Sequence, residues 1–196
     1  MNKTIQYYNE NAQEFYDRTI DTDLSATYDI FLKYLPKKAH ILDAGCGVGR
    51  DSKIFLNQRY MVTAFDASRE MALMASKETG LAIGCFTFQE MYFNQCFDAV
   101  WAQFSLIHIP YDGTREVYAK IHNSLKPSGI FFASYKYGET HMPTLERDFY
   151  NMNESMVLPY FEGLFDVLEI WTEKDTRSKK SPSQDAMILN FIARKK

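Results

Sequence analysis

Residues 39–52 read AHILDAGCGVGRDS, and the expected fold of the rest of the chain follows from this stretch. Ile41 and Leu42 close a short apolar run typical of a strand, and Asp43 stands where that strand should end. Glycines follow at alternate positions, 45, 47 and 49, and a polar segment then opens a helix. Glycine permits positive φ and lets a ligand lie against the backbone. A strand, a glycine turn and a helix N-terminus together predict a nucleotide-type cofactor site, with free N–H groups at the carboxyl edge of a sheet.

The spacing of these glycines argues against a dinucleotide. The dinucleotide fingerprint is G-x-G-x-x-G, whereas here the spacing is G-x-G-x-G and Arg50 occupies the place of the last glycine. The Asp43 carboxylate would repel a pyrophosphate but suits a cofactor with positive charge near the turn, such as an ammonium beside a sulfonium. No G-K-[ST] follows the glycines, which excludes a P-loop. Asp66 ends the next apolar run, 61–65, where a carboxylate can accept both hydroxyls of an adenosine ribose.

These motifs resemble a known family. DAGCGVG at 43–49 and TAFDAS at 63–68 are similar to motif I and the second-strand acid of class I S-adenosylmethionine-dependent methyltransferases. The likeness continues in the family's order through FDAVWAQFSLIHIP, LKPSG and GIFFASYKYGE, so that its core spans about 41–138. Within the class, the chain most resembles small stand-alone bacterial enzymes, including those labelled tellurite-resistance-like, whose glycine loop also runs into Arg. This narrower resemblance identifies no substrate.

The resemblance implies an α/β fold: a Rossmann-like three-layer sandwich with a seven-stranded, mostly parallel sheet of order 3-2-1-4-5-7-6. One domain would span 1–196, with 1–35 as an N-terminal helical lid or cap and 39–196 as the core. The cofactor would be S-adenosyl-L-methionine, with S-adenosyl-L-homocysteine as product and an O, N or S atom of a small molecule as methyl acceptor. Three alternatives stay open: a tRNA or protein methyltransferase, a non-catalytic S-adenosylmethionine-binding protein, and an ordinary NAD-type Rossmann enzyme.

The resemblance also assigns candidate residues for cofactor binding. Phe88 and Gln89 follow the third strand, where the family places residues that flank the adenine. Many relatives carry an Asp there for the exocyclic amine; in this chain Gln89 or Glu90 must serve. Arg50 has two interpretations, a contact with the cofactor carboxylate or an ion pair with a nearby acid. The full candidate set for the cofactor is Asp43, Ala44, Gly45, Cys46, Gly47, Asp66, Ala67, Phe88, Gln89 and Gln103.

Two residues are candidates for catalysis. His108 lies just past the end of the fourth strand, and its ordinary pKa suits a general base. The alternative is that His108 only packs and forms local hydrogen bonds. Tyr8 belongs to an N-terminal aromatic group with Tyr7, Phe15 and Tyr16, which we expect to close over the cofactor or to attach a surface helix to the sheet.

Apolar periodicity and turn residues predict the elements. We expect helices over about 5–19, 25–35 (capped by Ser25 or Asp23), 50–58, 68–79 (capped by Ser68 and closed by Gly80) and from Thr114 to about 125. We expect strands over 41–43, 61–65, 81–86, 98–104 and 130–135, with KPSG at 126–129 as the turn into the last of these. Two further runs, 166–172 and 186–193, should pair as a hairpin that adds one antiparallel strand.

Composition narrows the function classes. A net charge of −3 and a pI near 5.8 give no electrostatic reason to expect nucleic acid or an acidic membrane as partner. The adenine-amino methylase motif [DN]-P-P-[FY] is absent after the fourth strand, which argues against DNA modification. Three cysteines without C-x-x-C spacing and four histidines without paired spacing predict neither disulfides nor a metal. The polar N-terminus is unlike a signal peptide and no apolar run reaches about 20 residues, so we expect a cytoplasmic protein that does not enter the membrane.

Overall fold

The computed structural model describes residues 2–175 and 186–196, and its centre is one seven-stranded sheet of order β3-β2-β1-β4-β5-β9-β8. The strands of this sheet are β1 (His40–Ala44), β2 (Met61–Asp66), β3 (Gly84–Cys85), β4 (Phe97–Gln103), β5 (Leu125–Lys136), β8 (Phe165–Lys174) and β9 (Met187–Lys195). β9 runs antiparallel to both β5 and β8, and the other neighbouring pairs are parallel. Counting only these seven strands along the chain gives 3-2-1-4-5-7-6, which confirms the expected fold class.

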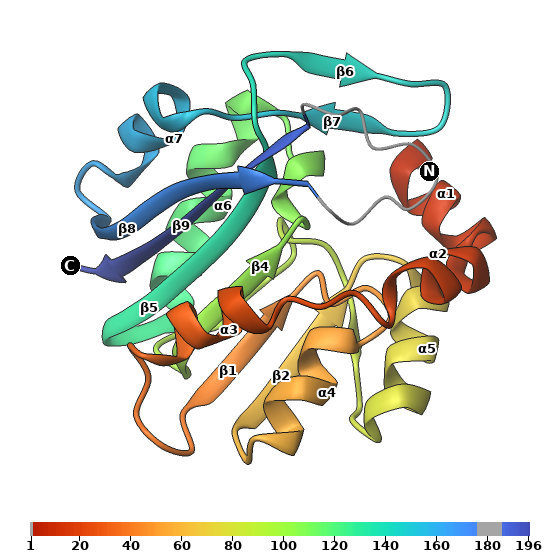
Figure 1. The fold of residues 1–196 in the computed structure, drawn as a ribbon, viewed down its shortest axis with the longest axis horizontal. Helices are drawn as coiled ribbons and strands as arrows, with labels where there is room; N and C mark the ends of the chain where they lie inside the picture. The colour runs from red at the N-terminus through yellow and green to blue at the C-terminus, as the bar shows by residue number, and fades with distance from the viewer. Residues whose placement is uncertain (1, 176–185) are drawn as a thin grey trace.

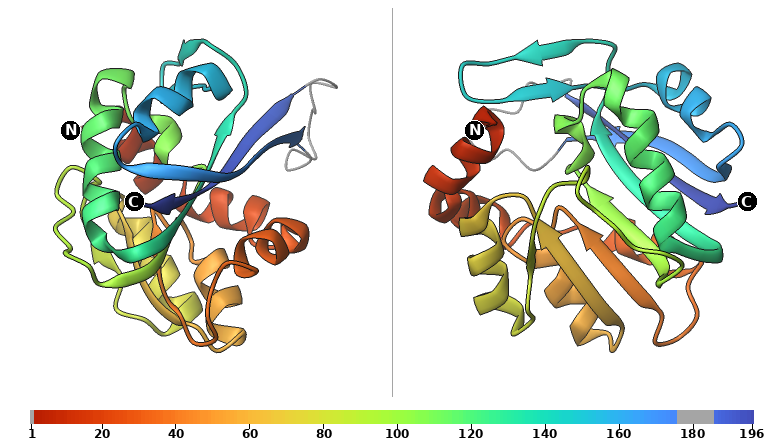
Figure 2. Two further views of the ribbon diagram at one scale, coloured as in Figure 1. Left: turned by 90° about the vertical axis from the view of Figure 1, so that its left-hand side faces the viewer. Right: turned by 180° about the vertical axis from the view of Figure 1, so that it is seen from behind.

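Helices cover both faces of the sheet (Figures 1 and 2). The helices are α1 (Lys3–Glu10), α2 (Ala12–Thr19), α3 (Ser25–Leu32), α4 (Arg50–Asn57), α5 (Arg69–Thr79), α6 (Tyr111–Ser124) and α7 (Glu154–Phe161), with a short 3₁₀ turn η1 (Leu106–His108). Because successive strand residues point to opposite faces, Ile41 packs under α3 and α4 whereas Leu42 packs with the residues under α6 and α7. Among the described residues no helix is both long and apolar enough to cross a membrane.

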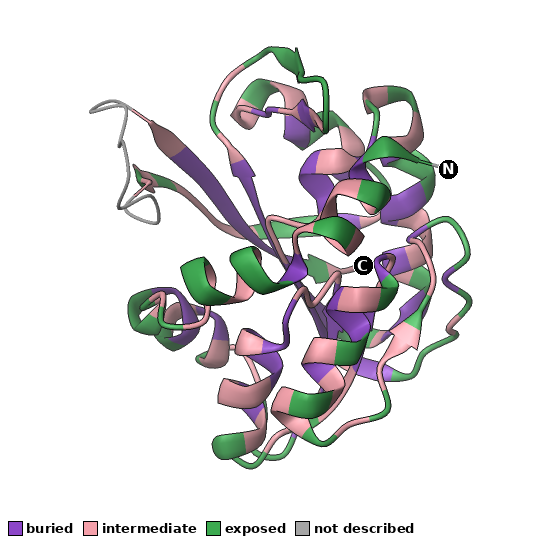
Figure 3. Ribbon diagram, turned by 90° about the vertical axis from the view of Figure 1, so that its right-hand side faces the viewer, coloured by how far each residue is buried: buried purple, intermediate pink, exposed green. Residues whose placement is uncertain are grey.

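The core is strongly aromatic. On the α3 side Trp101 stacks on Phe132 with ring centroids 4.0 Å apart, and Phe31 packs against both rings. In Figure 3 the central strands are largely buried in the interior, while the outer faces of the helices are exposed. Buried, nearly continuous apolar strands of this kind fix the register of the sheet. They also fix where each strand ends, and therefore where the loops at the carboxyl edge begin.

Several elements differ from the sequence expectations. The helix expected over 5–19 is two helices that meet at Asn11, and the third strand is reduced to two residues. KPSG is not a turn before a strand but a bulge within β5: Phe97 pairs with Leu125, and Ala99 pairs with Ile130. Leu125 therefore begins that strand rather than ending a helix. The charged segment between β8 and β9 lies largely outside the described residues.

The structure also contains a second small sheet and one helix that the sequence pattern does not predict. β6 (His141–Pro143) and β7 (Asp148–Tyr150) form an antiparallel hairpin, and α7 follows it. Three-residue strands are too short to show alternation, and α7 is an apolar helix that contains Pro159. The hairpin lies beside α1 above the carboxyl edge of the sheet (Figure 1). There Lys3 pairs with Asp148 at 2.9 Å and donates to the Thr144 carbonyl at 2.9 Å. The two segments together form a cover over the site.

Candidate active site

A cavity of about 430 Å³ opens at the carboxyl edge of the sheet, under α1, α2 and the hairpin. Its volume is in the range of sites for small ligands. Most of the residues predicted for cofactor binding and catalysis line this cavity, and only Asp43 and Ala44 lie outside it. Those that line it are Tyr8, Gly45, Cys46, Gly47, Asp66, Ala67, Phe88, Gln89, Gln103 and His108.

The glycine turn forms one end of the cavity, which we call the glycine-loop end. Gly45 has φ +74°, and a Cβ placed on it would lie 2.4 Å from Ser105 Cβ, so no other residue fits there without a shift. The amides of Gly45 and Cys46 both donate to the Phe65 carbonyl at 2.9 Å, and the Gly47 amide donates to Asp66 Oδ2 at 2.9 Å. The expectation of free N–H groups at this turn is thus wrong for these three amides, because β2 already accepts from them.

Asp66 stands at the end of β2, where the sequence predicts it. Its carboxylate accepts from the Gly47 amide and, at 2.8 Å, from the Ser68 amide, and it lines the cavity. Each carboxylate oxygen keeps a further lone pair for a ligand hydroxyl. Desolvation by the surrounding protein raises the pKa of Asp66 to about 6, although the two amide hydrogen bonds oppose that shift.

Asp43 lies beneath the glycine turn rather than in the cavity. It is almost fully buried and accepts a hydrogen bond from Ser52 Oγ at 2.6 Å, which ties the end of β1 to α4. Burial, with the nearby Asp51 charge, raises the pKa of Asp43 to about 8. Ala44 is also behind the turn, where its carbonyl accepts from Ser105 Oγ at 2.6 Å. Both residues hold the loop from below, and neither presents its side chain to the cavity.

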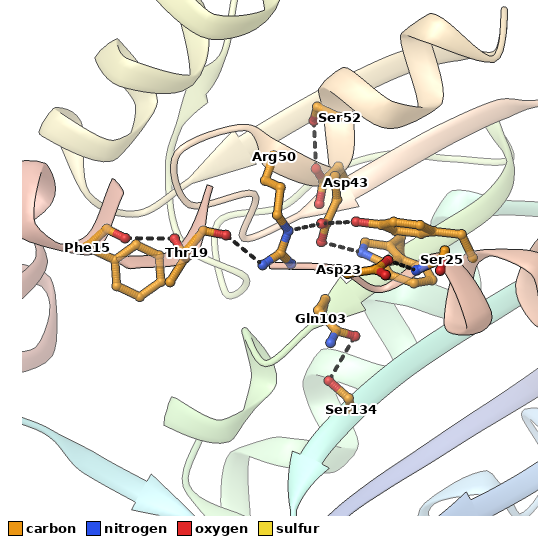
Figure 4. A network of polar contacts seen from close by, with 12 residues as sticks. Phe15, Thr19, Asp23, Ser25, Asp43, Arg50, Ser52, Gln103 and Ser134 are labelled. Carbon is orange, nitrogen blue, oxygen red and sulfur yellow. Dashed lines mark hydrogen bonds and ion pairs between the residues drawn. The ribbon is translucent and has the colours of Figure 1, made fainter. Parts of the chain in front are cut away.

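Arg50 forms the ion pair that was one of its two predicted interpretations (Figure 4). Its Nε lies 2.6 Å from Asp51 Oδ1, and its Nη1 donates to the Thr19 carbonyl at 3.3 Å. Asp51 also accepts from Tyr28 at 2.6 Å and from the Trp101 indole at 2.8 Å. Burial opposes ionisation of Asp51, but the Arg50 charge and these hydrogen bonds lower its pKa. The pair therefore connects the N-terminal helices to the core at the wall of the cavity.

The apolar part of the glycine-loop end comes from the segment after β3. Phe88 is buried and meets Phe65 edge to face at 5.2 Å. Gln89 lines the cavity, whereas Glu90 turns back to accept from the amide and hydroxyl of Thr87 at 2.8 and 2.9 Å. Of the two polar candidates for the adenine amine, the geometry therefore favours Gln89. Burial raises the pKa of the Cys46 thiol, so this neighbour of the turn is neutral.

The opposite end, which we call the aromatic end, is lined by Tyr8, His108, Lys136, Arg147 and Phe149. His108 Nδ1 lies 2.6 Å from the Asp148 carbonyl oxygen, which can only accept, so Nδ1 carries the proton in the neutral ring. Nε2 is then the acceptor, and the Tyr8 hydroxyl donates to it at 3.0 Å. Desolvation is the main cause that lowers the pKa of His108 to about 4, with smaller contributions from the Arg147 and Lys136 charges. The imidazole is therefore neutral near pH 7.

Gln103 lies between the two ends, at the end of β4. Its Oε1 accepts from Ser134 Oγ at 3.0 Å, and Ser134 Oγ accepts from the Phe104 amide at 2.9 Å (Figure 4). Because the oxygen is engaged, the amide nitrogen is the donor that Gln103 can offer to a ligand.

Sequence reasoning missed Ser105, Lys136, Arg147 and Phe149 as lining residues. Ser105 follows β4 and Lys136 ends β5. Both could have been predicted to line the site, because they lie at the carboxyl ends of predicted strands. Arg147 and Phe149 belong to the hairpin that no pattern predicted. No cluster of metal-ligating side chains occurs in the part of the chain that the structure describes.

The residues present fit an adenosine cofactor. The glycine turn leaves no room for side chains against its backbone, Asp66 offers carboxylate oxygens at the strand end, and Phe88 supplies an apolar surface. When bound, S-adenosylmethionine supplies an electrophilic methyl group. The protein's own contribution is to bind and orient its partners in this cavity.

Comparisons with known proteins agree with this interpretation. The family described as "Methyltransferase domain" matches residues 41–129. An uncharacterized methyltransferase of Staphylococcus carnosus is 23% identical over 171 residues, covering 78% of this chain and 83% of that protein.

Two solved structures share the fold. A SAM-dependent methyltransferase of Methanosarcina mazei superposes with a TM-score of 0.75 at 16% identity, covering 86% of this chain and 97% of that one. The 1,6-didemethyltoxoflavin-N1-methyltransferase of Burkholderia thailandensis, solved with 1,6-didemethyltoxoflavin and S-adenosylhomocysteine, also has a TM-score of 0.75, at 23% identity over 97% of this chain and 84% of that one. The narrower likeness to tellurite-resistance-like enzymes stays a prediction. Together, the matched domain, the glycine loop and the sheet order show that residues 41–129 form a methyltransferase domain in a chain with the fold of class I S-adenosylmethionine-dependent methyltransferases.

Proposed function

We propose that this enzyme methylates an O, N or S atom of a small molecule held at the aromatic end of the cavity. The observation that carries the proposal is the Tyr8–His108 hydrogen bond of 3.0 Å, which lies in the same cavity as the glycine turn and Asp66. The cavity volume of about 430 Å³ and the cover made by α1 and the hairpin support a compact acceptor rather than a polymer. The toxoflavin-type substrate of the Burkholderia neighbour is also a small molecule.

The geometry supports a separate role for each group of residues. The cofactor is held by Gly45, Gly47, Asp66, Phe88 and Gln89, with Cys46, Ala67 and Gln103 beside it. Tyr8 contacts the acceptor, and its hydroxyl oxygen can accept a hydrogen bond from it. His108, whose two ring nitrogens bind Asp148 and Tyr8, holds that hydroxyl in position. With a pKa of about 4, His108 is a weak base, so positioning is its main contribution.

Helices α1 and α2 of the segment 1–35 act as a lid in this proposal, whereas α3 packs in the core through Phe31. Asn9 Oδ1 accepts from the Ser68 hydroxyl at 2.8 Å and from the Glu70 amide at 3.2 Å, so α1 binds the start of α5. Lys3 binds the hairpin on the other side. Closure of such a segment excludes water and completes the acceptor site.

The test uses the purified enzyme and S-adenosylmethionine with a labelled methyl group. One reaction receives a panel of small heteroaromatic acceptors, the second receives bulk tRNA, and the third receives a mixture of unfolded proteins. We expect label in low-mass products only. Label transferred to tRNA or protein, with none in the small molecules, would overturn the proposal in favour of the polymer alternatives.

A further inference from the structure

The aromatic end holds a cation that no carboxylate of the described residues pairs with. Arg147, on the segment that joins the two strands of the hairpin, stacks its guanidinium over the Tyr7 ring at 3.9 Å and lies 5.0 Å from the Phe149 ring. Its hydrogen bond to the Tyr8 hydroxyl, from Nη1, is a long one at 3.4 Å. Its Nε is buried and has no hydrogen-bond partner within the described residues.

The carboxylates of Asp148, Asp51 and Asp66 have partners other than Arg147. The carboxylate of the next residue, Asp148, pairs with Lys3 at 2.9 Å and with His141 at 3.4 Å. Asp51 is held by Arg50, and Asp66 binds the glycine turn. No described acid comes within ion-pair distance of the Arg147 guanidinium.

A second cation lies on the same wall. Lys136, at the end of β5, places its Nζ 3.8 Å from the centre of the Phe149 ring. Asp175 also lines the cavity beyond the end of β8, so two cations and one carboxylate occupy this side. Planar guanidinium groups bind carboxylate and related anions through paired N–H donors. A buried N–H donor without a hydrogen-bond partner lowers the stability of the folded protein.

We propose that the methyl acceptor is a small planar acid that binds as its anion, with the negative group against the Arg147 guanidinium and the ring on the aromatic surface of Tyr8 and Phe149. This inference rests on the proposed function, since it names the substrate class of the same cavity. Tyr8 and Phe149 supply apolar faces.

The test measures binding, independently of turnover. Enzyme saturated with S-adenosylhomocysteine is titrated with matched acids and amides (benzoate and benzamide, 2-hydroxybenzoate and 2-hydroxybenzamide, nicotinate and nicotinamide), followed by ligand-observed NMR. We expect at least one acid to bind about tenfold or more tightly than its own amide, as a charge-assisted hydrogen bond predicts. Arg147→Gln should remove this preference and leave binding of the amides within about twofold of wild type.

Arg69→Gln is the matched control, because Arg69 is an exposed residue at the start of α5. Saturation with S-adenosylhomocysteine, checked by calorimetry for each variant, shows that the cofactor site is intact. If no acid is preferred over its amide, or if Arg147→Gln keeps the preference, the acid assignment is overturned. Methyl transfer to a neutral small molecule would in that case leave the proposed function standing.

Discussion

The Tyr8 hydroxyl donates to Nε2 of His108 at 3.0 Å, and the Asp148 carbonyl accepts from Nδ1 of the same ring at 2.6 Å. One imidazole thereby joins three segments that are far apart in the chain: α1, the turn after β4 and the hairpin. This relationship fixes the tautomer of His108 and places α1 in contact with the aromatic end of the site.

Removal of the Tyr8 hydroxyl should affect turnover more than cofactor binding. For Tyr8→Phe we expect kcat/KM for the acceptor to fall about tenfold or more, because one hydrogen bond to the acceptor and to His108 is lost. The dissociation constant of S-adenosylhomocysteine should stay within about twofold by calorimetry. Tyr34→Phe is the control, since that hydroxyl binds Glu169 on β8. If Tyr8→Phe and Tyr34→Phe have the same kcat/KM, Tyr8 does not contact the acceptor.

Asp66 should control cofactor affinity. For Asp66→Asn we expect S-adenosylhomocysteine to bind about tenfold or more weakly, because a charged acceptor for its hydroxyls is replaced by a neutral amide. With a pKa of about 6, wild-type Asp66 takes up a proton below that pH, so wild-type affinity should fall as the pH drops from about 7 to about 5. The affinity of the Asn variant should change little over this range. If calorimetry shows that wild-type affinity for S-adenosylhomocysteine does not change with pH, the cofactor hydroxyls do not bind Asp66.

Asp43 should make the folded state less stable as the pH rises. Its folded pKa of about 8 lies above the ordinary value of 3.8, so the folded chain holds more protons than the unfolded chain between these pH values. Stability therefore falls with rising pH, by up to about 1.4 kcal/mol per unit, and this loss is complete above about pH 8. For Asp43→Asn the loss disappears. The melting temperature of the variant relative to wild type should thus increase from about pH 5 to about pH 8 and level off above it.

Asp29→Asn serves as the control for that series, because Asp29 is exposed on α3. Its melting temperature should follow wild type at every pH. A constant offset between Asp43→Asn and wild type across the whole range would show that the Asp43 pKa is ordinary.

Two glycines with similar backbones should respond differently to alanine. Gly80 has φ +76°, and no described atom lies within 4 Å of the position that a Cβ would take. Gly80→Ala should therefore lower the free energy of unfolding by about 1–2 kcal/mol, because alanine disfavours the left-handed conformation. Gly49 has φ +88°, and its Cβ would lie 2.9 Å from Ala75 Cα, where α4 and α5 approach closely. Gly49→Ala should cost about 1–3 kcal/mol more, measured by urea unfolding. Equal losses would mean that the two helices can separate without cost.

Deletion of residues 1–20 should leave a folded protein with a cooperative melt, because the sheet begins at His40. Cofactor binding should weaken, since the deletion removes the Asn9 contacts with α5 and the Phe15 ring beside Gly47. Activity should be nearly lost, and protease cleavage of the full chain within this segment should slow when S-adenosylhomocysteine is added. Unchanged affinity would make the segment a packing element only. Failure to fold would make it part of the core.

The glycine-loop end of the site could be predicted without a structure, and so could the sheet order that the family motifs imply. Strand, glycine turn and helix follow one another within 39–52, and Asp66 ends the adjacent strand, so local pattern alone places these groups at one edge. Gly80 and Ser68 likewise end and cap α5 through local backbone chemistry. Such features depend on neighbours within a few residues, and a sequence displays those neighbours directly.

The aromatic end, in contrast, depends on tertiary packing. Tyr8 and His108 are 100 positions apart, Tyr8 and Arg147 are 139 apart, and no periodicity relates them. Their contact depends on how α1 packs against α5 and the hairpin, and the hairpin has strands of three residues each. Whether Asp43 faces the cavity or lies beneath the turn is also a matter of packing, because a strand-end side chain can point to either side. Long-range packing sets these orientations, so they cannot be predicted from the local sequence pattern.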